Sequence, residues 1–419
     1  MRPARTCTRG ARVALGVLAL ALAPAAPAAA QSPAVGQRPP ELRAPAAILV
    51  EPATGDVVFS RNPGQRRSIA STTKLMTALL TLEHASLSRE MTVVRYHAAP
   101  AESVAGLRPG ERLTVADLLR ALLLESANDA AATLAHDVAG SQQAFVAMMN
   151  RRARELGLTD THYTNPIGLD EGSNRSSAAD LVKLTLILRR NAFFRAVTDL
   201  PRATLRSGAH ARTVFNRNLL VRAVPFVNGV KTGHTQKAGY VLVGSATRRG
   251  VTVISAVLGD PSEAARDDDT LALLRYGLRR YERAAAVQAG RRYGQAKLRY
   301  RDGHVSLVAS RTVLRTIRRG EPVTTRVDAP AELDGPLPAH TRVGTIELRW
   351  RGRTVDRVAL VTATPVAAAG FLDRLRQSPG GIAGLVAFAA VALASLQLVL
   401  LRRRAVRRRR RHARETEIA

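Results

Sequence analysis

The chain has 419 residues and a formal net charge of +30, with 46% apolar and 23% charged residues. Its length requires at least two folded units, because one hydrophobic core rarely serves more than about 250–300 residues. The apolar content excludes a disordered or fibrous protein, and only 4% aromatic residues disfavour a base-stacking surface for nucleic acid. The single cysteine, Cys7, lies in a segment that we expect to be removed, so disulfides and thiolate metal sites are excluded from the mature chain.

Residues 1–30 have the pattern of a secretory signal peptide. Four arginines precede an apolar run at 13–23 that is too short to cross a bilayer comfortably, and three alanines at 28–30 form a small-residue cleavage site. We expect export followed by cleavage, and the alternative is an uncleaved anchor. Residues 31–44 are rich in proline and polar residues, which predicts a linker.

The segment 45–284 mixes strand and helix patterns, which predicts one α+β domain. Its strand patterns predict a hairpin at 47–60 and a second one formed by strands at 240–246 and 251–257. Apolar residues at helical spacing fill the region between them and return after the second hairpin. The expected helices lie at 75–87, 115–124, 130–138, 144–156, 178–188 and 268–282.

The sequence pattern changes near residue 286, where short stretches of alternating apolar and polar residues are separated by proline and glycine. This pattern predicts a small all-β domain over residues 286–368. We see no catalytic cluster in it and interpret it as a spacer, with a partner-binding site as the alternative. The expected strands lie at 296–300, 305–309, 323–327, 343–350 and 355–361.

The C-terminal region predicts a membrane anchor. Residues 380–401 carry no charge and are long enough to cross a hydrocarbon core of about 30 Å. Nine arginines follow within 402–419, which indicates a cytoplasmic tail and a body outside the cytoplasm. A buried core helix is disfavoured because the segment lacks a polar face. An exported body also makes nucleic acid an unexpected partner, despite the net charge.

Two lysines stand out because lysine is rare, with five among the 63 Lys and Arg residues. Codon bias explains the general excess of arginine, but only lysine can serve as a deprotonatable amine. Lys74 lies three residues after Ser71 at the start of an expected helix, so the amine and the hydroxyl share one helix face. Serine is a good nucleophile only when a base takes its proton, and an amine with a lowered pKa can do so. The ordinary alternative is a capped helix.

Two further motifs follow along the chain. Ser126 and Asn128 come directly after the helix expected at 115–124, where a simple helix cap is the alternative. Lys231, Thr232 and Gly233 precede the expected strand at 240–246, where they could be no more than a polar strand start. Each motif alone is weak, and their order in an exported chain is what makes them informative.

Together the three motifs resemble those of the penicillin-recognising serine enzymes. The stretch 231–240, KTGHTQKAGY, is similar to a signature of the low-molecular-mass penicillin-binding proteins, the serine-type D-alanyl-D-alanine carboxypeptidases. Residues 69–77, 126–130 and 168–180 fit the same family. The resemblance implies a serine transpeptidase/β-lactamase-like catalytic domain, in which helices flank an antiparallel sheet. The β-rich domain and the C-terminal anchor also match the family layout.

The resemblance implies a role for each motif residue. Ser71 would be the nucleophile, Lys74 its base, and Ser126 would pass a proton to the leaving amine. Backbone N–H groups of Ser71 and His234 would form the oxyanion hole, and Asp180 would anchor the loop near His234. The implied substrate-binding residues are Asn128, Lys231, Thr232, Gly233, His234 and Arg266. No metal or other cofactor is implied.

The implied activity is removal of the terminal D-alanine from peptidoglycan stem peptides, with β-lactam antibiotics as acylating inhibitors. A DD-endopeptidase or a β-lactamase of the same fold is one alternative. A silent peptidoglycan-binding scaffold is another, which the intact motifs disfavour. Glu171 and Asn174 do not have the spacing of the β-lactamase deacylation loop, so we do not expect fast penicillin hydrolysis.

Overall fold

The structure of the chain is a computed structural model that describes residues 38–170, 172–378 and 380–416, with side chains up to residue 408. The expected signal peptide and the first part of the expected linker lie outside these ranges. The end of that linker is packed rather than free, because Leu42 and Ala44 are buried. The backbone N–H groups of Arg43 and Ala44 donate to the carboxylate of Asp269 at 2.6 and 2.9 Å.

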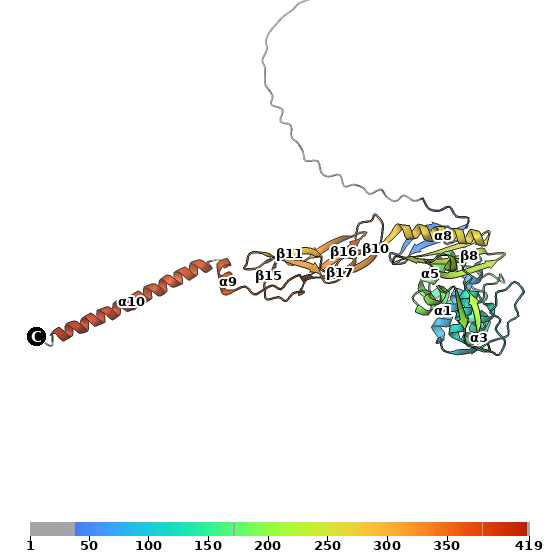
Figure 1. Cartoon of the computed structure of the whole chain (residues 1–419), viewed down its shortest axis with the longest axis horizontal. Coiled ribbons are helices and arrows are strands. Elements are labelled where there is room, and N and C mark those ends of the chain that lie inside the picture. Colours follow the sequence, from blue (N-terminus) through green and yellow to red (C-terminus); the bar gives the residue numbers. More distant parts are fainter. Residues whose placement is uncertain (1–37, 171, 379, 417–419) are drawn as a thin grey trace, which may run out of the picture. The chain divides into compact units, whose positions relative to one another are not determined.

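A five-stranded antiparallel sheet lies at the centre of the first domain, in the order β2-β1-β9-β8-β7 (Figure 1). The hairpins expected from the sequence are confirmed as β1–β2 and β8–β9. All six residues of β1 are buried, since both faces of the sheet are covered. The strands are β1 (Ala46–Glu51), β2 (Asp56–Arg61), β7 (Val227–Thr235), β8 (Gly239–Arg248) and β9 (Val251–Asp260).

The Lys231 motif lies inside an edge strand rather than before the strands. β7 pairs only with β8 in the sheet, and Lys231 is opposite Val243 in that pair. The sequence placed this motif before the expected strands, with a polar strand start as the alternative, because its polar residues hide the strand pattern. The consequence is that the motif is held by a ladder of backbone hydrogen bonds, with one edge of β7 free of any sheet partner.

Helices cover the two faces of the sheet and enclose two apolar cores. Helix α8 (Glu263–Arg280) packs on one face, with Leu49, Val257 and Leu273 in its core (Figure 1). The larger core lies on the other face, under α1 and α5. The remaining helices are α1 (Lys74–His84), α2 (Val115–Arg120), α3 (Asn128–Ala139), α4 (Gln142–Glu155), α5 (Ala178–Leu188), α6 (Ala192–Thr198) and α7 (Leu219–Ala223).

Helix α8 starts earlier than its apolar pattern predicts. Ser262 caps it, accepting a hydrogen bond from the N–H of Ala265 at 3.1 Å, so the first turn is polar. Two pairs of short strands and two irregular helices complete this domain; the strand pairs and the first irregular helix were not expected, while the second ends the helix expected at 115–124. They are β3–β4 (Glu90–Thr92, Arg112–Thr114), β5–β6 (Arg202–Leu205, Arg212–Phe215), the 3-10 helix η1 (Ala70–Thr73) and the π-helix η2 (Ala121–Glu125).

The second domain is all-β, as the sequence indicates. A six-stranded sheet has the order β14-β16-β17-β12-β11-β15, and a two-stranded sheet pairs β10 with β13. Its core includes Val287, Leu307, Ile346 and Leu360. The strands are β10 (Tyr281–Val287), β11 (Arg292–Leu298), β12 (His304–Ala309), β13 (Val313–Arg318), β14 (Thr324–Asp328), β15 (Glu332–Leu333), β16 (Arg342–Trp350) and β17 (Arg353–Thr362).

The C-terminal region consists of a short helix, α9 (Phe371–Gln377), and a long one, α10 (Gly381–Thr416). Within the described residues, Gly381–Arg408 is the one segment long and apolar enough to cross a membrane. Its 28 residues span about 42 Å at the α-helical rise. The arginines after residue 401 continue the same helix instead of forming a separate tail.

Candidate active site

Ser71 and Lys74 meet at the junction of η1 and α1. The Nζ of Lys74 lies 2.9 Å from the Oγ of Ser71 and donates to the carbonyl oxygen of Ile167 at 2.7 Å. Lys74 is fully buried. Burial lowers its pKa well below the ordinary value, the charge of Lys231 lowers it further, and two nearby carboxylates oppose the shift in part. An amine in this position is available to accept the Ser71 proton.

Close backbone packing holds the turn at Ser71 in place. Ala70, next to Ser71, has a φ of 46°, a left-handed conformation that is uncommon for a residue with a Cβ. A Cβ on Gly168 would lie 2.0 Å from the carbonyl oxygen of Ala70, and one on Gly233 would lie 3.1 Å from the backbone N of Ser71. Only glycine fits at Gly168, and the tight space at Gly233 favours glycine there as well.

Ser126 and Asn128 stand at a sharp change of direction between two helices. The π-helix η2 ends at Ser126, whose φ of 65° is left-handed. Ser126 is 6% exposed, and within the described residues its Oγ has no hydrogen-bond partner. Asn128 begins α3 and donates from Nδ2 to Glu102 at 2.7 Å. The buried, unpaired hydroxyl of Ser126 is therefore free to take part in proton transfer.

Lys231 is the second buried lysine of the site. It is 1% exposed, and its Nζ donates to the carbonyl oxygen of Thr232 at 3.0 Å. Burial lowers its pKa to about 7, with help from the charges of Arg217 and Arg266, while Glu125 opposes them. These groups place a concentration of positive charge beside β7, which suits an anionic group of a bound molecule.

Arg266 and His234 have different surroundings. Arg266, on α8, is 2% exposed, and its guanidinium pairs with Glu263 and Asp267 at 2.8–2.9 Å, so part of its charge is already balanced. His234 is exposed on β7, and its ring stacks on that of Tyr240 with centroids 4.0 Å apart.

The expected tether between Asp180 and the His234 loop is wrong. The Asp180 carboxylate accepts hydrogen bonds from the backbone N–H of Asp160 and from the hydroxyl of Thr161. Asp170 makes the tether instead: it accepts from Thr235 Oγ1 at 2.8 Å and from the backbone N–H of Lys237 at 3.2 Å. Both aspartates lie in the matched 168–180 stretch, and sequence alone could not separate their partners.

Three charged residues at the site belong to none of the sequence motifs. Glu102 bonds to Asn128, and Arg217 pairs with Glu125 at 2.5 Å next to Lys231. They come from the β3–β4 connection, the β6–α7 connection and η2, which are distant in sequence. Only Arg217 had a signal in the sequence that could have identified it, because it lies between two asparagines in a short polar stretch.

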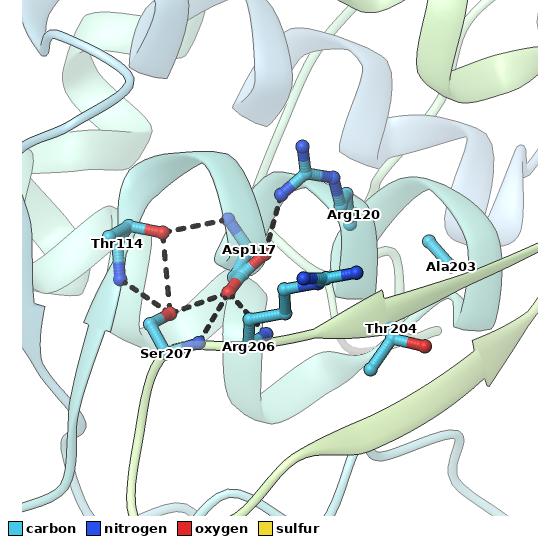
Figure 2. A pocket seen from close by; sticks show the side chains of 7 residues that line it. All are labelled: Thr114, Asp117, Arg120, Ala203, Thr204, Arg206 and Ser207. Carbon is cyan, nitrogen blue, oxygen red and sulfur yellow. Dashed lines mark hydrogen bonds and ion pairs between the residues drawn. The ribbon is translucent and has the colours of Figure 1, made fainter.

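A separate polar pocket of about 540 Å³ lies between α2 and the β5–β6 hairpin (Figure 2). Asp117 is buried there and accepts hydrogen bonds from the Ser207 hydroxyl and from the backbone N–H groups of Arg206 and Ser207. Arg120 reaches the other oxygen at 2.6 Å. Burial alone would raise the pKa of Asp117, but these hydrogen bonds outweigh it and lower the pKa. The network anchors the hairpin and contains no motif residue.

No metal site accompanies these groups. Within the described residues, no three His, Cys, Asp or Glu side chains are grouped so that they could hold a metal ion.

Comparison with known proteins gives consistent matches. A family profile described as D-alanyl-D-alanine carboxypeptidase matches residues 33–262. The D-alanyl-D-alanine carboxypeptidase DacD of Salmonella typhimurium is 32% identical over 381 residues, covering 87% of this chain and 96% of that protein.

Solved structures show the same likeness. Penicillin binding protein 5 of Haemophilus influenzae superposes with a TM-score of 0.57 and 28% identity, over 79% of this chain and 100% of that one. The DD-transpeptidase of Streptomyces K15 gives a TM-score of 0.55 and 33% identity, over 58% of this chain and 100% of that one.

Proposed function

The chain belongs to the D-alanyl-D-alanine carboxypeptidase family, and we propose that Ser71 is the nucleophile with which it removes the terminal D-alanine from peptidoglycan stem peptides. The chain is a serine peptidase with a penicillin-binding-protein-like fold, as the sequence predicts. One observation carries the assignment of Ser71: its Oγ lies 2.9 Å from the fully buried amine of Lys74.

The acylation step begins with proton transfer from Ser71 Oγ to the neutral amine of Lys74. The Oγ then bonds to the carbonyl carbon of the penultimate D-alanine, and the N–H groups of Ser71 and His234 stabilise the oxyanion. When the C–N bond breaks, Lys74 gives up this proton, which reaches the departing amine of D-alanine through the unpaired hydroxyl of Ser126. Asn128 holds the substrate amide during this exchange. The product is an ester on Ser71.

Hydrolysis of the ester completes the reaction. A water molecule adds to the ester carbonyl and gives a proton to the amine of Lys74. The C–O bond then breaks, Ser71 Oγ takes back a proton, and the shortened peptide leaves with a new carboxylate.

Positive charge selects a substrate with a free C-terminal carboxylate. The buried Lys231 and the hydroxyl of Thr232 bind this carboxylate, and Arg266 adds to the field. Gly233 lets β7 approach the nucleophile turn, so that the carboxylate and the scissile bond are bound on one strand. A β-lactam presents a comparable carboxylate and a strained amide, and it acylates Ser71 by the same route.

The location follows from the C-terminal helix. The apolar part of α10 crosses the membrane, and the arginines that follow keep their end in the cytoplasm. The catalytic domain is then outside the cytoplasm, where peptidoglycan is found.

The proposal is tested with the full chain in detergent, an acylated peptide ending in D-Ala-D-Ala, and the variants Ser71→Ala and Ser86→Ala. Ser86 is an exposed serine after α1 and serves as the matched control. We expect D-alanine release by the wild type and by Ser86→Ala, and none above background by Ser71→Ala. Release by Ser71→Ala would contradict the assignment.

A second assay separates the alternatives. A fluorescent penicillin should label the wild type and leave Ser71→Ala unlabelled. Labelling without D-alanine release would favour an endopeptidase, rapid turnover of the penicillin would favour a β-lactamase, and a folded chain with neither property would favour a scaffold.

A further inference from the structure

Glu102 is a carboxylate at the active site that belongs to none of the three motifs. It lies in the connection between β3 and β4 and is partly buried. Its Oε2 accepts a hydrogen bond from Asn128 Nδ2 at 2.7 Å and another from the hydroxyl of Tyr96. Its Oε1 accepts from the backbone N–H of Ala99 at 3.1 Å. The side chain is therefore held by three donors from two parts of the chain.

The loop that carries Glu102 is attached to α3 by other bonds. The backbone N–H of Asn128 donates to the carbonyl oxygen of Ser103 at 2.8 Å. The carboxylate of Asp129 accepts from the N–H groups of Ala105 and Leu107 at 3.1 and 2.9 Å. These three bonds already attach the loop to α3. The contact between Glu102 and the Asn128 side chain is therefore not needed for that attachment and can serve another purpose.

That contact determines which end of the Asn128 amide faces the loop. An ionised carboxylate only accepts hydrogen bonds, so it attracts the Nδ2 end of the amide and repels the Oδ1 end. A 180° turn of the Asn128 side chain would bring two oxygens together at about 2.7 Å. Glu102 thus keeps Oδ1 pointing away from the loop and leaves the second Nδ2 hydrogen available.

Glu102 remains charged and acts on Lys74 as well. Burial would raise the pKa of Glu102, but the hydrogen bonds from Tyr96 and Asn128 outweigh it and lower the pKa. The charged groups that face Lys74 are Lys231 on β7, Glu102 on the loop and Asp129 on α3. The two carboxylates raise the pKa of Lys74, against the larger effect of its burial.

We propose that Glu102 is a positioning residue of the acyl-transfer reaction, which holds the Asn128 amide in the single orientation that binds the substrate amide. The inference rests on the proposed function, since that function assigns Asn128 to the substrate. The carboxylate of Glu102, which lies outside the motifs, is then required to orient the side chain of Asn128, which lies within one.

The principal test replaces the carboxylate by its neutral amide in Glu102→Gln, with Glu90→Gln as the matched control. Glu90 is exposed on β3 and pairs with Arg112, so its change removes the same charge away from the site. A glutamine at 102 has one oxygen for three donors, so its NH₂ group must face at least one of them.

We expect kcat/KM for D-alanine release to fall roughly tenfold to a hundredfold in Glu102→Gln and to stay unchanged in Glu90→Gln. The acidic limb of the pH–rate profile should move to lower pH, because the pKa of Lys74 falls when the nearby negative charge is lost. Glu102→Asp, which keeps the charge, should restore the position of that limb. Wild-type kcat/KM together with an unmoved limb in Glu102→Gln would overturn the proposal.

A second readout does not depend on activity. The chain has only five lysines, so ¹³Cε-lysine labelling gives a spectrum simple enough to follow the titration of Lys74, assigned with Lys74→Arg. We expect Lys74 to titrate at lower pH in Glu102→Gln than in the wild type or in Glu90→Gln. An unchanged Lys74 titration with a lowered melting temperature would mean a structural role only and would overturn the proposal. If the wild type released no D-alanine, the proposed function would fail, and this titration would still decide whether Glu102 acts on the site.

Discussion

Individual residues at the site have unusual chemistry because the fold removes them from water. Lys74 and Lys231 are both fully or almost fully buried, and each has a lowered pKa. Ala70 and Ser126 adopt left-handed backbone conformations, which cost roughly 1–3 kcal/mol each when the residue is not glycine. Surrounding packing must supply this free energy, and at Ala70 the chain around Gly168 packs closely against the strained turn.

Asp260 and Asp269 form a buried pair of carboxyl groups where β9 meets α8. Asp260 is 1% exposed, and burial together with the negative charge of Asp269 raises its pKa to about 7. The charges of Arg266 and Arg43 oppose this shift only in part. Asp269 accepts two backbone hydrogen bonds from the packed N-terminal segment.

We predict that Asp260→Asn makes the protein more stable at pH 8 than at pH 5, relative to the wild type. Between pH 4 and pH 7 the folded wild type holds a proton that the unfolded chain has released, so its free energy of unfolding falls as the pH rises. Asparagine has no proton to lose there, and the gain at pH 8 should be about 1–3 kcal/mol. Thermal unfolding of both proteins at the two pH values measures it. An equal difference at pH 5 and pH 8 would show that Asp260 does not carry this proton.

The contacts of site residues could be predicted from the sequence only where the residues lie in one local motif. Ser71 and Lys74 have a helical spacing that indicates a contact, and the contact is present. Glu102 and Asp170 could not be assigned, because their partners depend on how loops distant in sequence come together.

At the scale of elements, the site is an assembly of short irregular pieces supported by regular ones. The nucleophile turn in η1 is packed between the edge strand β7 and the segment around Gly168. The π-helix η2 turns the chain at Ser126 before α3 begins. Irregular backbone positions the reacting groups, while the sheet and the long helices keep that backbone from relaxing.

We predict that Gly168→Ala lowers D-alanine release on the order of a hundredfold, because the new methyl group would push the nucleophile turn away from its position. Gly55→Ala is the control: its φ of 76° is also left-handed, but nothing lies within 4 Å of the added carbon. Both variants introduce backbone strain, but only Gly168→Ala introduces a steric clash with the nucleophile turn. Equal activities at equal melting temperatures would refute the role of this contact.

The elements with a clear hydrophobic period were predictable, and those without one were not. The central hairpins and the helices at α1, α3, α4 and α5 follow their patterns closely. The strand β13 (Val313–Arg318) was missed because arginines interrupt its alternation, and β10 (Tyr281–Val287) because it follows α8 without a break. The arginines do not prevent backbone pairing, which joins these two strands with one irregularity at Ala286.

The whole molecule combines a catalytic domain, a β domain and a long C-terminal helix. The arginines of that helix lie at its cytoplasmic end in our proposal, where they can also meet anionic lipid headgroups. Tm and activity measurements on the full chain therefore need a detergent or a bilayer.

We predict that the full chain stays with the membrane fraction through high-salt and alkaline washes and is released only by detergent. Each apolar residue of α10 adds transfer free energy that charge screening does not remove. Deleting residues 380–419 should release a soluble protein with unchanged activity on a soluble peptide. Extraction of the full chain by salt alone would contradict a spanning helix.

The burial of two lysines has a practical consequence for covalent surface chemistry. Among the five lysines, amine-reactive reagents can reach Lys183, Lys237 and Lys297, because these three are exposed and the other two are enclosed. Lys237 follows the Lys231 motif in the β7–β8 turn, so a bulky tag there would stand at the end of the strand that carries the motif. Lys237→Arg leaves two lysine attachment points, one on each folded domain, and allows coupling to beads or dyes with Lys74 and Lys231 untouched.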